Sequence, residues 1–170
     1  KTIKAIIAIN ADILGLVELE NNATASLADL VSGLNDVVGS NTYAFLNTGT
    51  IGTDAIKVGF IYKPASATLV GDFAILDSTV DPTFIDSKSR PTLAQTFSTT
   101  SGEKLTLAIN HFKSKGSSCD ALGDVDLNDG QGNCASTRAS AATALVNWLA
   151  TDPTNSDDPD FLILGDLNAY

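Results

Sequence analysis

Three apolar runs of this sequence end in side chains that can do chemistry. One run ends at Glu18, a second at Asn110-His111, and a third at Gly165-Asp166-Leu167-Asn168. Binding and catalytic groups on layered sheets are usually built where buried strands open into such polar loops. These three endings therefore predict a polar site, with Glu18 as a candidate metal ligand and His111 as a candidate catalytic group.

Each of these signals also has a simpler structural interpretation. A carboxylate at a strand end is often a solvated terminus or a helix cap, and a lone histidine is more often a packing residue. Gly-Asp-x-Asn is also a typical turn sequence, because Gly, Asp and Asn favour turns. His111 is the only histidine of the chain, which excludes every metal motif that needs two histidines within this sequence. The three signals therefore carry weight only in combination.

The two cysteines, Cys119 and Cys134, lie in a stretch rich in Gly, Asp and Asn. Free cysteines are usually buried in apolar surroundings, and this stretch is not apolar. We therefore expect a disulfide, which would contribute about 3 kcal/mol of stability in the chain-entropy model. A disulfide indicates an oxidising compartment, that is, an extracellular or periplasmic location.

The same stretch contains the run of alternating Asp and Asn at 124–130, so a small structural calcium site is one interpretation of it. The run resembles the start of a calcium-binding loop. However, its glycine, Gly130, comes one position late for an EF-hand, and Ala135 stands where the bidentate glutamate is needed. A turn-rich loop closed by a disulfide is the second interpretation, and the sequence leaves both open.

Composition and charge limit the class of protein. With 170 residues, 44% of them hydrophobic and 18% charged, the chain is long enough for one globular domain and too short for two. No apolar run approaches the roughly 20 residues that span a bilayer, so no membrane partner is expected. The net charge of −10 argues against loose electrostatic binding of nucleic acid. An acidic enzyme can still bind a polyanion where a divalent cation and a few local basic residues supply the attraction.

Hydrophobic periodicity predicts the elements that must position these side chains. Apolar residues recur every three or four positions in three segments, which predicts helices over Thr2–Asn10, Ser26–Val38 and Thr137–Leu149. We expect Ser26 to cap the second helix. The inward face of the third helix is expected to hold Ala142, Leu145, Val146 and Leu149. Shorter apolar or alternating runs predict strands, over Ile13–Glu18, Thr42–Leu46, Ile56–Tyr62, Thr68–Asp72, Leu93–Thr99, Lys104–His111 and Phe161–Leu164. This mixture is typical of an α+β fold in which sheets pack together under outer helices.

In this order, the motifs resemble the endonuclease/exonuclease/phosphatase superfamily, which includes deoxyribonuclease-like enzymes, over nearly the whole chain. The segment Ala11–Glu18 is similar to the family's strand that ends in a metal-binding glutamate, and Leu107–Lys115 is similar to its histidine strand. Asp54–Pro64 resembles its strand of the form Gly-Phe-Ile-Tyr-Lys-Pro, and Ser89-Arg90-Pro91 resembles its Arg-Pro motif. Leu162–Ala169 matches its Gly-Asp-x-Asn motif.

The resemblance implies a fold, and it also implies that this chain is incomplete. The family's fold is a four-layer α/β/β/α sandwich, here a single domain over residues 1–170 with its site at one mouth of the sandwich. The family begins with a strand that carries an asparagine ligand and ends with an Asp-His pair. Neither lies in this sequence, so we expect a fragment that is incomplete at both ends. Without the terminal histidine as general base or acid, we expect it to be inactive by itself.

The resemblance further implies a ligand set for one hydrated divalent cation, Mg²⁺ or else Mn²⁺ or Ca²⁺. Glu18, Asp166 and Asn168 would hold this cation together with several waters, as hard cations prefer. Asp166 would also orient or deprotonate the attacking water, and Asn168 would hold the scissile phosphate or the metal. His111 would donate a hydrogen bond to the phosphoryl oxygens, which is an electrostatic role.

The expected activity is metal-dependent hydrolysis of phosphodiesters by a monomeric extracellular nuclease that acts on DNA, RNA or both. The cysteine loop is most similar to the secreted bacterial nuclease branch. Arg90, Lys113 and Lys115 are candidate contacts to the phosphates, although the two lysines could equally belong to a solvated loop. The nearest rival is a phosphatase or a sphingomyelinase-type phosphoesterase with the same fold. A non-catalytic binding module is the rival from a different class.

Overall fold

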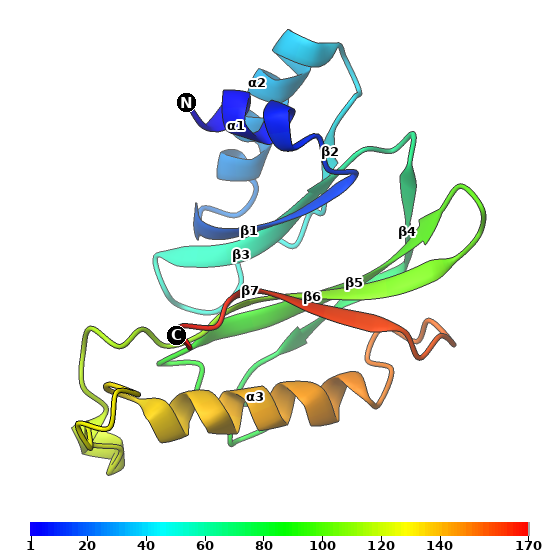
Figure 1. Ribbon diagram of the computed structural model, residues 1–170. Coiled ribbons are helices and arrows are strands. Elements are labelled where there is room, and N and C mark those ends of the chain that lie inside the picture. The colour runs from blue at the N-terminus through cyan, green and yellow to red at the C-terminus, as the bar shows by residue number, and fades with distance from the viewer. Residues whose placement is uncertain (170) are drawn as a thin grey trace.

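Two β-sheets pack face to face between helices in the computed structural model, which describes residues 1–169 (Figure 1). The helices are α1 (Thr2–Ile9), α2 (Ala25–Val38) and α3 (Ala135–Leu149), with a short 3-10 helix at Asp120–Leu122. The strands are β1 (Ile13–Glu20), β2 (Ala44–Phe45), β3 (Ile56–Tyr62), β4 (Ala67–Leu76), β5 (Arg90–Thr99), β6 (Lys104–His111) and β7 (Phe161–Asp166). One sheet has the order β1-β3-β2 and the other β4-β5-β6-β7. Strands β6 and β7 pair in parallel, and the other pairs are antiparallel.

Three apolar clusters separate the four layers, and they confirm the α/β/β/α sandwich expected from the sequence. Between the sheets lie Val58 and Phe60 of β3 with Leu93 and Phe97 of β5, each fully buried or nearly so. A second cluster packs α1 and α2 against the smaller sheet, and a third packs α3 against the larger sheet (Figure 1). The ring of Phe97 meets Phe60 edge to face, at 5.6 Å between centroids. Burial of each large apolar side chain stabilises the fold by roughly 1.5–3 kcal/mol.

The two sheets approach each other closely where β1 crosses β6 and β7. A Cβ atom at Gly15 would lie 2.5 Å from Leu164 Cδ1 and 2.8 Å from Ile109 Cδ1, so the crossing fits a residue without a side chain. Val17, two residues further along β1, packs against the cluster between the sheets. Because interiors are close-packed, this crossing holds the last residues of β1, β6 and β7 in one region of the molecule.

The second helix begins differently from the prediction. It starts at Ala25 with Thr24 as its N-cap, so the expectation that Ser26 caps it is wrong. The Ser26 hydroxyl instead donates to the backbone oxygen of Glu20 at 2.9 Å. The carboxamide oxygen of Asn22 accepts the Ser26 backbone N–H at 3.0 Å, and it thereby satisfies one of the N–H groups that a helix start leaves unpaired.

The third helix buries a different face from the predicted one. Leu145 and Leu149 are buried as expected, but Val146 is 49% exposed and Ala142 is also exposed. The positions buried in their place are Ala141 and Ala144, which pack on the larger sheet. The reason is steric: the sheet presents small residues here, so the helix approaches closely through its own alanines, and alanine gives the hydrophobic pattern little contrast.

The strands are present where they were predicted, with some different bounds. Strand β1 continues two residues past Glu18, and β7 continues through Gly165 to Asp166. Strand β4 runs on to Leu76, with a break in its pairing register around Gly71, where φ is +62°. Strand β2 is only two residues long. The extension of β7 matters for the site, because it puts Asp166 inside a strand, opposite His111, rather than beyond the strand.

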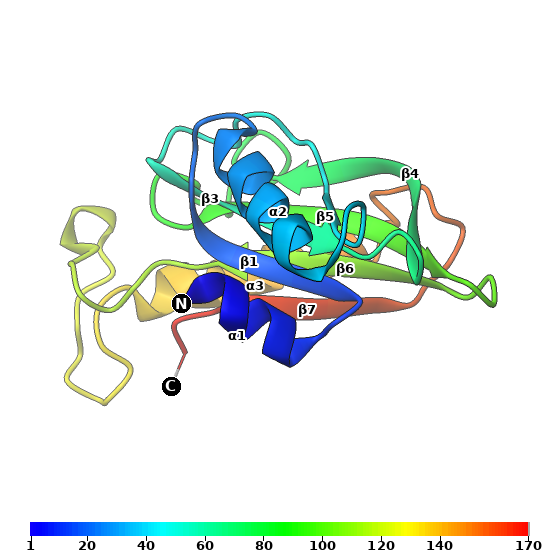
Figure 2. The same cartoon turned by 90° about the horizontal axis from the view of Figure 1, so that it is seen from above.

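The predicted disulfide is present and closes the long loop between β6 and α3. The Cα atoms of Cys119 and Cys134 are 5.2 Å apart. The loop projects from the end of the sandwich at which β6 ends (Figure 2). Its Asp124 caps α3, since its carboxylate accepts the backbone N–H of Thr137 at 2.7 Å and that of Ser136 at 3.2 Å. Among residues 1–169, no helix has the length and apolar character needed to cross a membrane.

Candidate active site

Three residues of the candidate site lie side by side across the larger sheet. In the strand register, Arg90 of β5 is opposite His111 of β6, and His111 is opposite Asp166 of β7. Strand β5 runs antiparallel to β6 and β7 runs parallel to it, so the start of β5 and the ends of β6 and β7 meet at the same edge. Residues far apart in the sequence thus form one row, which we call the Arg90–His111–Asp166 row. The Oδ2 atom of Asp166 lies 4.0 Å from His111 Nε2.

Glu18 approaches this row from the other sheet. Its backbone has a positive φ of 57°, and it lies where the pairing of β1 with β3 shifts register between Leu16 and Leu19. A bulge of this kind re-aims a side chain, and a non-glycine residue with positive φ is typical of functional sites. The side chain of Glu18 is exposed, and its charge acts on His111. The structure therefore places Asp166 beside His111, and the charge of Glu18 acts on the same imidazole.

His111 is a buried imidazole in a mixed electrostatic environment. Burial lowers its pKa, and so does the positive charge of Arg90, while the negative charges of Asp166, Glu18 and Asp54 oppose this shift. The net direction is downward, so the ring is neutral at pH 7. Among residues 1–169, its buried Nδ1 atom has no hydrogen-bond partner. An orphaned polar atom in a buried side chain indicates a place for a ligand or a water molecule.

The Gly-Asp-x-Asn motif forms the end of β7 and the turn after it. A Cβ atom at Gly165, whose φ is +123°, would overlap the backbone of Asn110 on β6, so only glycine allows the two strands to lie this close. Asp166 Oδ1 accepts the backbone N–H of Asn168 at 2.9 Å. The Nδ2 of Asn168 donates to the backbone oxygen of Phe112 at 3.0 Å. Its side-chain oxygen is the atom that remains to bind a cation or to accept a hydrogen bond.

The basic residues named from the sequence are placed differently from one another. Arg90 lies in the row, whereas the ammonium group of Lys113 turns into its own loop and bonds Ser117 Oγ at 2.7 Å and the Ser114 backbone oxygen at 3.0 Å. Lys115 lies further along the loop, with its side chain against Gly132. Lys113 is thus held within the loop rather than in the row.

A group of basic residues nevertheless surrounds Lys113. Burial lowers the pKa of Lys113, and the positive charges of Lys88, Arg90 and Arg138 lower it further. Three of the other nine basic residues of the chain therefore lie close enough to act on Lys113, and one of them, Arg90, belongs to the row. The chain carries a net charge of −10, so this clustering makes the region beside the row locally less negative than the rest of the protein.

One residue of the site was missed by the sequence reasoning. The Oδ2 atom of Asp54 lies 2.9 Å from Arg90 Nε, and the two groups form an ion pair. The carboxylate is not aligned with the N–H, so this buried Nε makes no hydrogen bond among the described residues. Asp54 lies in a loop before β3, in the other sheet from Arg90. No feature of the sequence joins the two, although Asp54 is the first residue of the segment that resembles a family strand.

The residues present fit a hard divalent cation of the Mg²⁺ type. Glu18 and Asp166 supply two carboxylates and Asn168 an amide oxygen, and such cations are typically held by one or two carboxylates with several retained waters. No group of three or more His, Cys, Asp or Glu side chains in the described part of the chain is close enough to form a full protein cage. A site here would therefore be completed by water or substrate oxygens.

The calcium interpretation of the 124–130 loop finds no support. The carboxylate of Asp124 is engaged by the start of α3. Asp126 accepts the N–H of Asn128 at 2.8 Å, and Asp129 accepts that of Gln131 at 2.9 Å. These carboxylates shape the turns of the loop, and residues 1–169 contain no cluster of acids there that could hold a metal.

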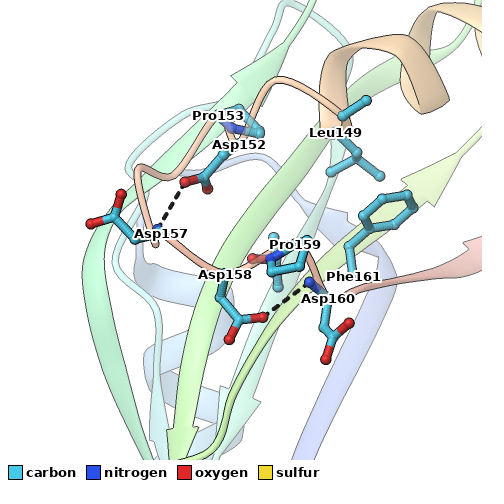
Figure 3. Close-up of a pocket in the computed structure, with 10 residues that line it drawn as sticks. Leu149, Asp152, Pro153, Asp157, Asp158, Pro159, Asp160 and Phe161 are labelled. Atoms are coloured by element: carbon cyan, nitrogen blue, oxygen red, sulfur yellow. Dashed lines mark hydrogen bonds between the residues drawn. The ribbon is translucent and has the colours of Figure 1, made fainter.

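Two cavities flank β7, one at each end of it. A cavity of about 510 Å³ lies at the start of β7, lined by Phe161, Leu149 and the acidic loop that precedes the strand (Figure 3). In that loop Asp152 accepts the N–H of Asp157 at 2.9 Å, so its carboxylate is occupied by backbone. A smaller cavity of about 220 Å³ lies beside Leu167 at the other end. The smaller cavity lies between α3 and the end of β7, and none of Arg90, His111 and Asp166 lines either cavity.

Solved structures with a similar fold superpose on nearly the whole chain. ANGEL2, described as a 2′,3′-cyclic phosphatase, superposes with a TM-score of 0.62 at 14% identity, over 98% of this chain and 42% of ANGEL2. TDP2 from Caenorhabditis elegans superposes with a TM-score of 0.53 at 15% identity, over 99% of this chain and 41% of TDP2. An endonuclease/exonuclease/phosphatase from Beutenbergia cavernae DSM 12333 gives 0.51 at 16% identity, over 98% and 41%. No family model matches the sequence, and no curated protein matches it.

These likenesses establish the fold. The chain has the fold of endonuclease/exonuclease/phosphatase proteins, which confirms the structural expectation drawn from the motifs. It spans 41% to 42% of the length of the three solved structures named above.

Proposed function

We propose that this chain is the central part of a metal-dependent phosphodiester hydrolase, and more narrowly of an extracellular nuclease that cleaves DNA, RNA or both. The observation that carries the proposal is the Arg90–His111–Asp166 row with Glu18 facing it from the opposite sheet. This arrangement combines two carboxylates for a cation with two buried nitrogen atoms, His111 Nδ1 and Arg90 Nε, that make no hydrogen bond among the described residues, although Arg90 Nε is ion-paired with Asp54. A phosphodiester needs both, since its oxygens carry charge that a cation and donors must stabilise.

The proposed mechanism gives each side chain one task. A divalent cation, Mg²⁺ or else Mn²⁺ or Ca²⁺, supplies stabilisation of the charge that develops on the phosphoryl group. Glu18, Asp166 and Asn168 hold this cation, and Asp166 also orients the attacking water or takes its proton. His111, neutral at pH 7 because its pKa is lowered, donates a hydrogen bond to a phosphoryl oxygen. Arg90 balances the remaining negative charge.

The proposed domain extends beyond this chain at both ends. Strands β1 and β7 are the outer strands of their sheets on the side that carries Glu18 and Asp166, and Leu162 of β7 is 52% exposed there. Open strand edges with exposed apolar side chains favour pairing with further strands. We infer that segments before Lys1 and after Tyr170 add strands here, and that they bring the asparagine ligand and the Asp-His pair. The isolated chain is then inactive.

The basic cluster next to the row supports a polyanionic substrate. The charges of Lys88, Arg90 and Arg138 act on Lys113 in a protein that is otherwise strongly acidic. A polynucleotide presents several phosphates to such a region, and Arg90 is the proposed contact that lies in the row. Lys113 and Lys115 stay proposed contacts from the sequence, and Lys113 would have to leave its bond to Ser117 to make one. The disulfide supports an extracellular or periplasmic protein, which acts as a monomer and without a membrane partner.

A second candidate is a phosphatase of the same fold. It is favoured by the similarity to ANGEL2, described as a 2′,3′-cyclic phosphatase and solved with adenosine-2′,3′-vanadate. That ligand is small, so a nucleotide-sized substrate competes with a polynucleotide as the natural one. A sphingomyelinase-type phosphoesterase and a non-catalytic binding module rank below these two, because no particular contact favours either of them.

The test is a substrate panel on the protein extended at both ends. With Mg²⁺ present, we expect cleavage of plasmid DNA or RNA, and loss of that cleavage in Asp166→Asn or after chelation of the metal. Adenosine 2′,3′-cyclic phosphate, sphingomyelin and nitrophenyl phosphate distinguish the rival substrates. An extended, folded protein that cleaves none of these would leave the binding module as the better interpretation, and robust cleavage by residues 1–170 alone would contradict the proposed roles.

A further inference from the structure

The loop 47–55 connects two strands of the smaller sheet, yet it touches the larger sheet at the site. Its Asp54 carboxylate lies 2.9 Å from the Nε of Arg90. Two residues earlier, Gly52 packs on Pro91, and a Cβ atom there would lie 3.0 Å from the proline ring. The loop therefore meets the first two residues of β5, which carry one end of the Arg90–His111–Asp166 row.

The loop is anchored to the turn that follows Glu18 by the side chain of Asn21. Its Nδ2 donates to the backbone oxygens of Ile51 and Asp54 at 2.8 and 2.9 Å, and its Oδ1 accepts the N–H of Ile51 at 3.1 Å. These bonds link the turn directly to the residue that pairs with Arg90. The conformation of the loop near Asp54 is thus tied to the end of β1.

A buried lysine forms a second anchor of the same loop. Lys57 is 1% exposed, and its ammonium group donates to the backbone oxygens of Ala23 and Gly49. Burial lowers its pKa. A buried ammonium group bonded to two carbonyls holds the two segments strongly, because breaking either bond leaves a charged donor unsatisfied.

We propose that Asp54 is a positioning residue that holds the Arg90 side chain in the row, with the anchored 47–55 loop as its rigid support. This inference rests on the proposed function only for its catalytic consequence. An exposed ion pair of two flexible side chains contributes little, because both must be ordered to form it. Here the Arg90 side chain is 20% exposed and that of Asp54 is 44% exposed, but the loop that carries Asp54 is already fixed by Asn21 and Lys57, so the carboxylate starts from an ordered backbone. The ion pair therefore selects one orientation of the guanidinium group, beside His111.

The inference also explains how the two sheets share one site. Glu18 precedes the turn that Asn21 anchors, and Arg90 is held by the loop that Asn21 binds. The same set of hydrogen bonds consequently places a carboxylate on one side of the site and a guanidinium on the other. A loss of Asp54 should free Arg90 while leaving Glu18 where it is.

The direct test uses the fact that the chain has only two arginines, Arg90 and Arg138. In the 170-residue protein the two Nε–H signals are resolved by NMR and assigned with Arg90→Lys. We expect Asp54→Asn to shift the Arg90 signal and to speed its exchange with water, and Asp54→Glu to restore it in part. The matched control is Asp12→Asn, which removes a partner of Lys63 at the other end of β1. An Arg90 signal unchanged in Asp54→Asn, with the fold intact by circular dichroism, would overturn the inference.

The catalytic consequence is measured in the extended protein. Misplacement of a positioning group by about 1 Å lowers rates by up to about 100-fold, so we expect Asp54→Asn to lower kcat/KM for the cleaved substrate by about 10- to 100-fold. The fall should be partly rescued by Asp54→Glu and absent in Asp12→Asn. An active wild type with unchanged Asp54→Asn kinetics would refute the positioning role. A wild type that cleaves no phosphoester would instead refute the proposed function, and the NMR result would still decide the contact.

Discussion

Replacement of Gly165 by alanine should destabilise the protein more than its small size suggests. Gly165 has a φ of +123°, and a Cβ atom there would overlap the oxygen, nitrogen and carbonyl carbon of Asn110. These are backbone atoms of the neighbouring strand, so no side-chain rotation can relieve the overlap. Relief requires the end of β7 to move away from β6, and Asp166 would move with it.

The expected loss of stability has two contributions. The backbone conformation alone disfavours an L residue by about 1–2 kcal/mol. Separation of the strand ends then weakens about two backbone hydrogen bonds, each contributing about 1 kcal/mol, and exposes part of the packing around them. We therefore expect Gly165→Ala to lower the free energy of unfolding by about 3–5 kcal/mol. For a chain of this size, each 1 kcal/mol corresponds to about 2–4 °C in Tm.

The assay is urea unfolding followed by circular dichroism, with two glycine controls. Gly102 has a φ of +90° but no atom within 4 Å of the place that a Cβ would take, so Gly102→Ala carries the backbone part alone. Gly116 has neither a positive φ nor a close neighbour, and Gly116→Ala should stay within about 0.5 kcal/mol of the wild type. If Gly165→Ala unfolds at the same urea concentration as Gly102→Ala, the close approach of β7 to β6 is not real and the reasoning fails.

Three further predictions follow from single contacts. In the extended, active protein, His111→Ala should lower kcat by about 100- to 1,000-fold with an unchanged circular dichroism spectrum, as expected for loss of one preorganised hydrogen-bond donor. A decrease in kcat of less than about tenfold would exclude His111 as that donor. Removal of the disulfide by Cys119→Ser with Cys134→Ser should lower the free energy of unfolding by about 3 kcal/mol. Reducing agent should lower the free energy of unfolding of the wild type equally and leave that of the double variant unchanged. Hydrogen bonds from the backbone of Ser156 hold the pKa of Asp152 below its usual value. The ionised Asp152 therefore stabilises the fold above the unfolded-state pKa of about 3.9, and this stabilisation is lost as pH falls through the folded-state pKa. Asp152→Asn should flatten that part of the acid unfolding curve, and an unaltered curve would contradict the prediction.

The sequence was sufficient for the residues at the strand ends. Glu18, His111 and Asp166 each follow an apolar run, and a buried strand that opens into polar residues is visible without any three-dimensional information. The meeting of His111 and Asp166 at one edge of the larger sheet depends on strand order and direction, which came from the motif resemblance rather than from periodicity. Once β6 and β7 are parallel neighbours, the pairing of His111 with Asp166 follows from the register.

Features that depend on contacts between distant segments could not be predicted in this way. Asp54 and Arg90 belong to different sheets, and nothing in either local sequence indicates a partner. Lys57 stands in a strand where a lysine would ordinarily face solvent, and only the two carbonyl groups around it explain its burial. The prediction of the inward face of α3 was wrong for a different reason. Ala142 and Ala141 are equal in hydrophobicity, and only contact with the surface of the sheet determines which of them is buried.

The parallel pairing of β6 with β7 has a consequence for how the protein folds. Antiparallel strands that are joined by a short turn can pair progressively from that turn. Strands β6 and β7 are instead joined through the cysteine loop, α3 and the acidic linker, so their pairing requires closure of a long stretch of chain. The segment between β6 and β7 must become compact before these two strands can pair, and contacts between residues far apart in the sequence form slowly. The cross-link between Cys119 and Cys134 shortens the effective tether and so should speed that late step. The edge that brings His111 beside Asp166 would accordingly be the last part of the sandwich to form.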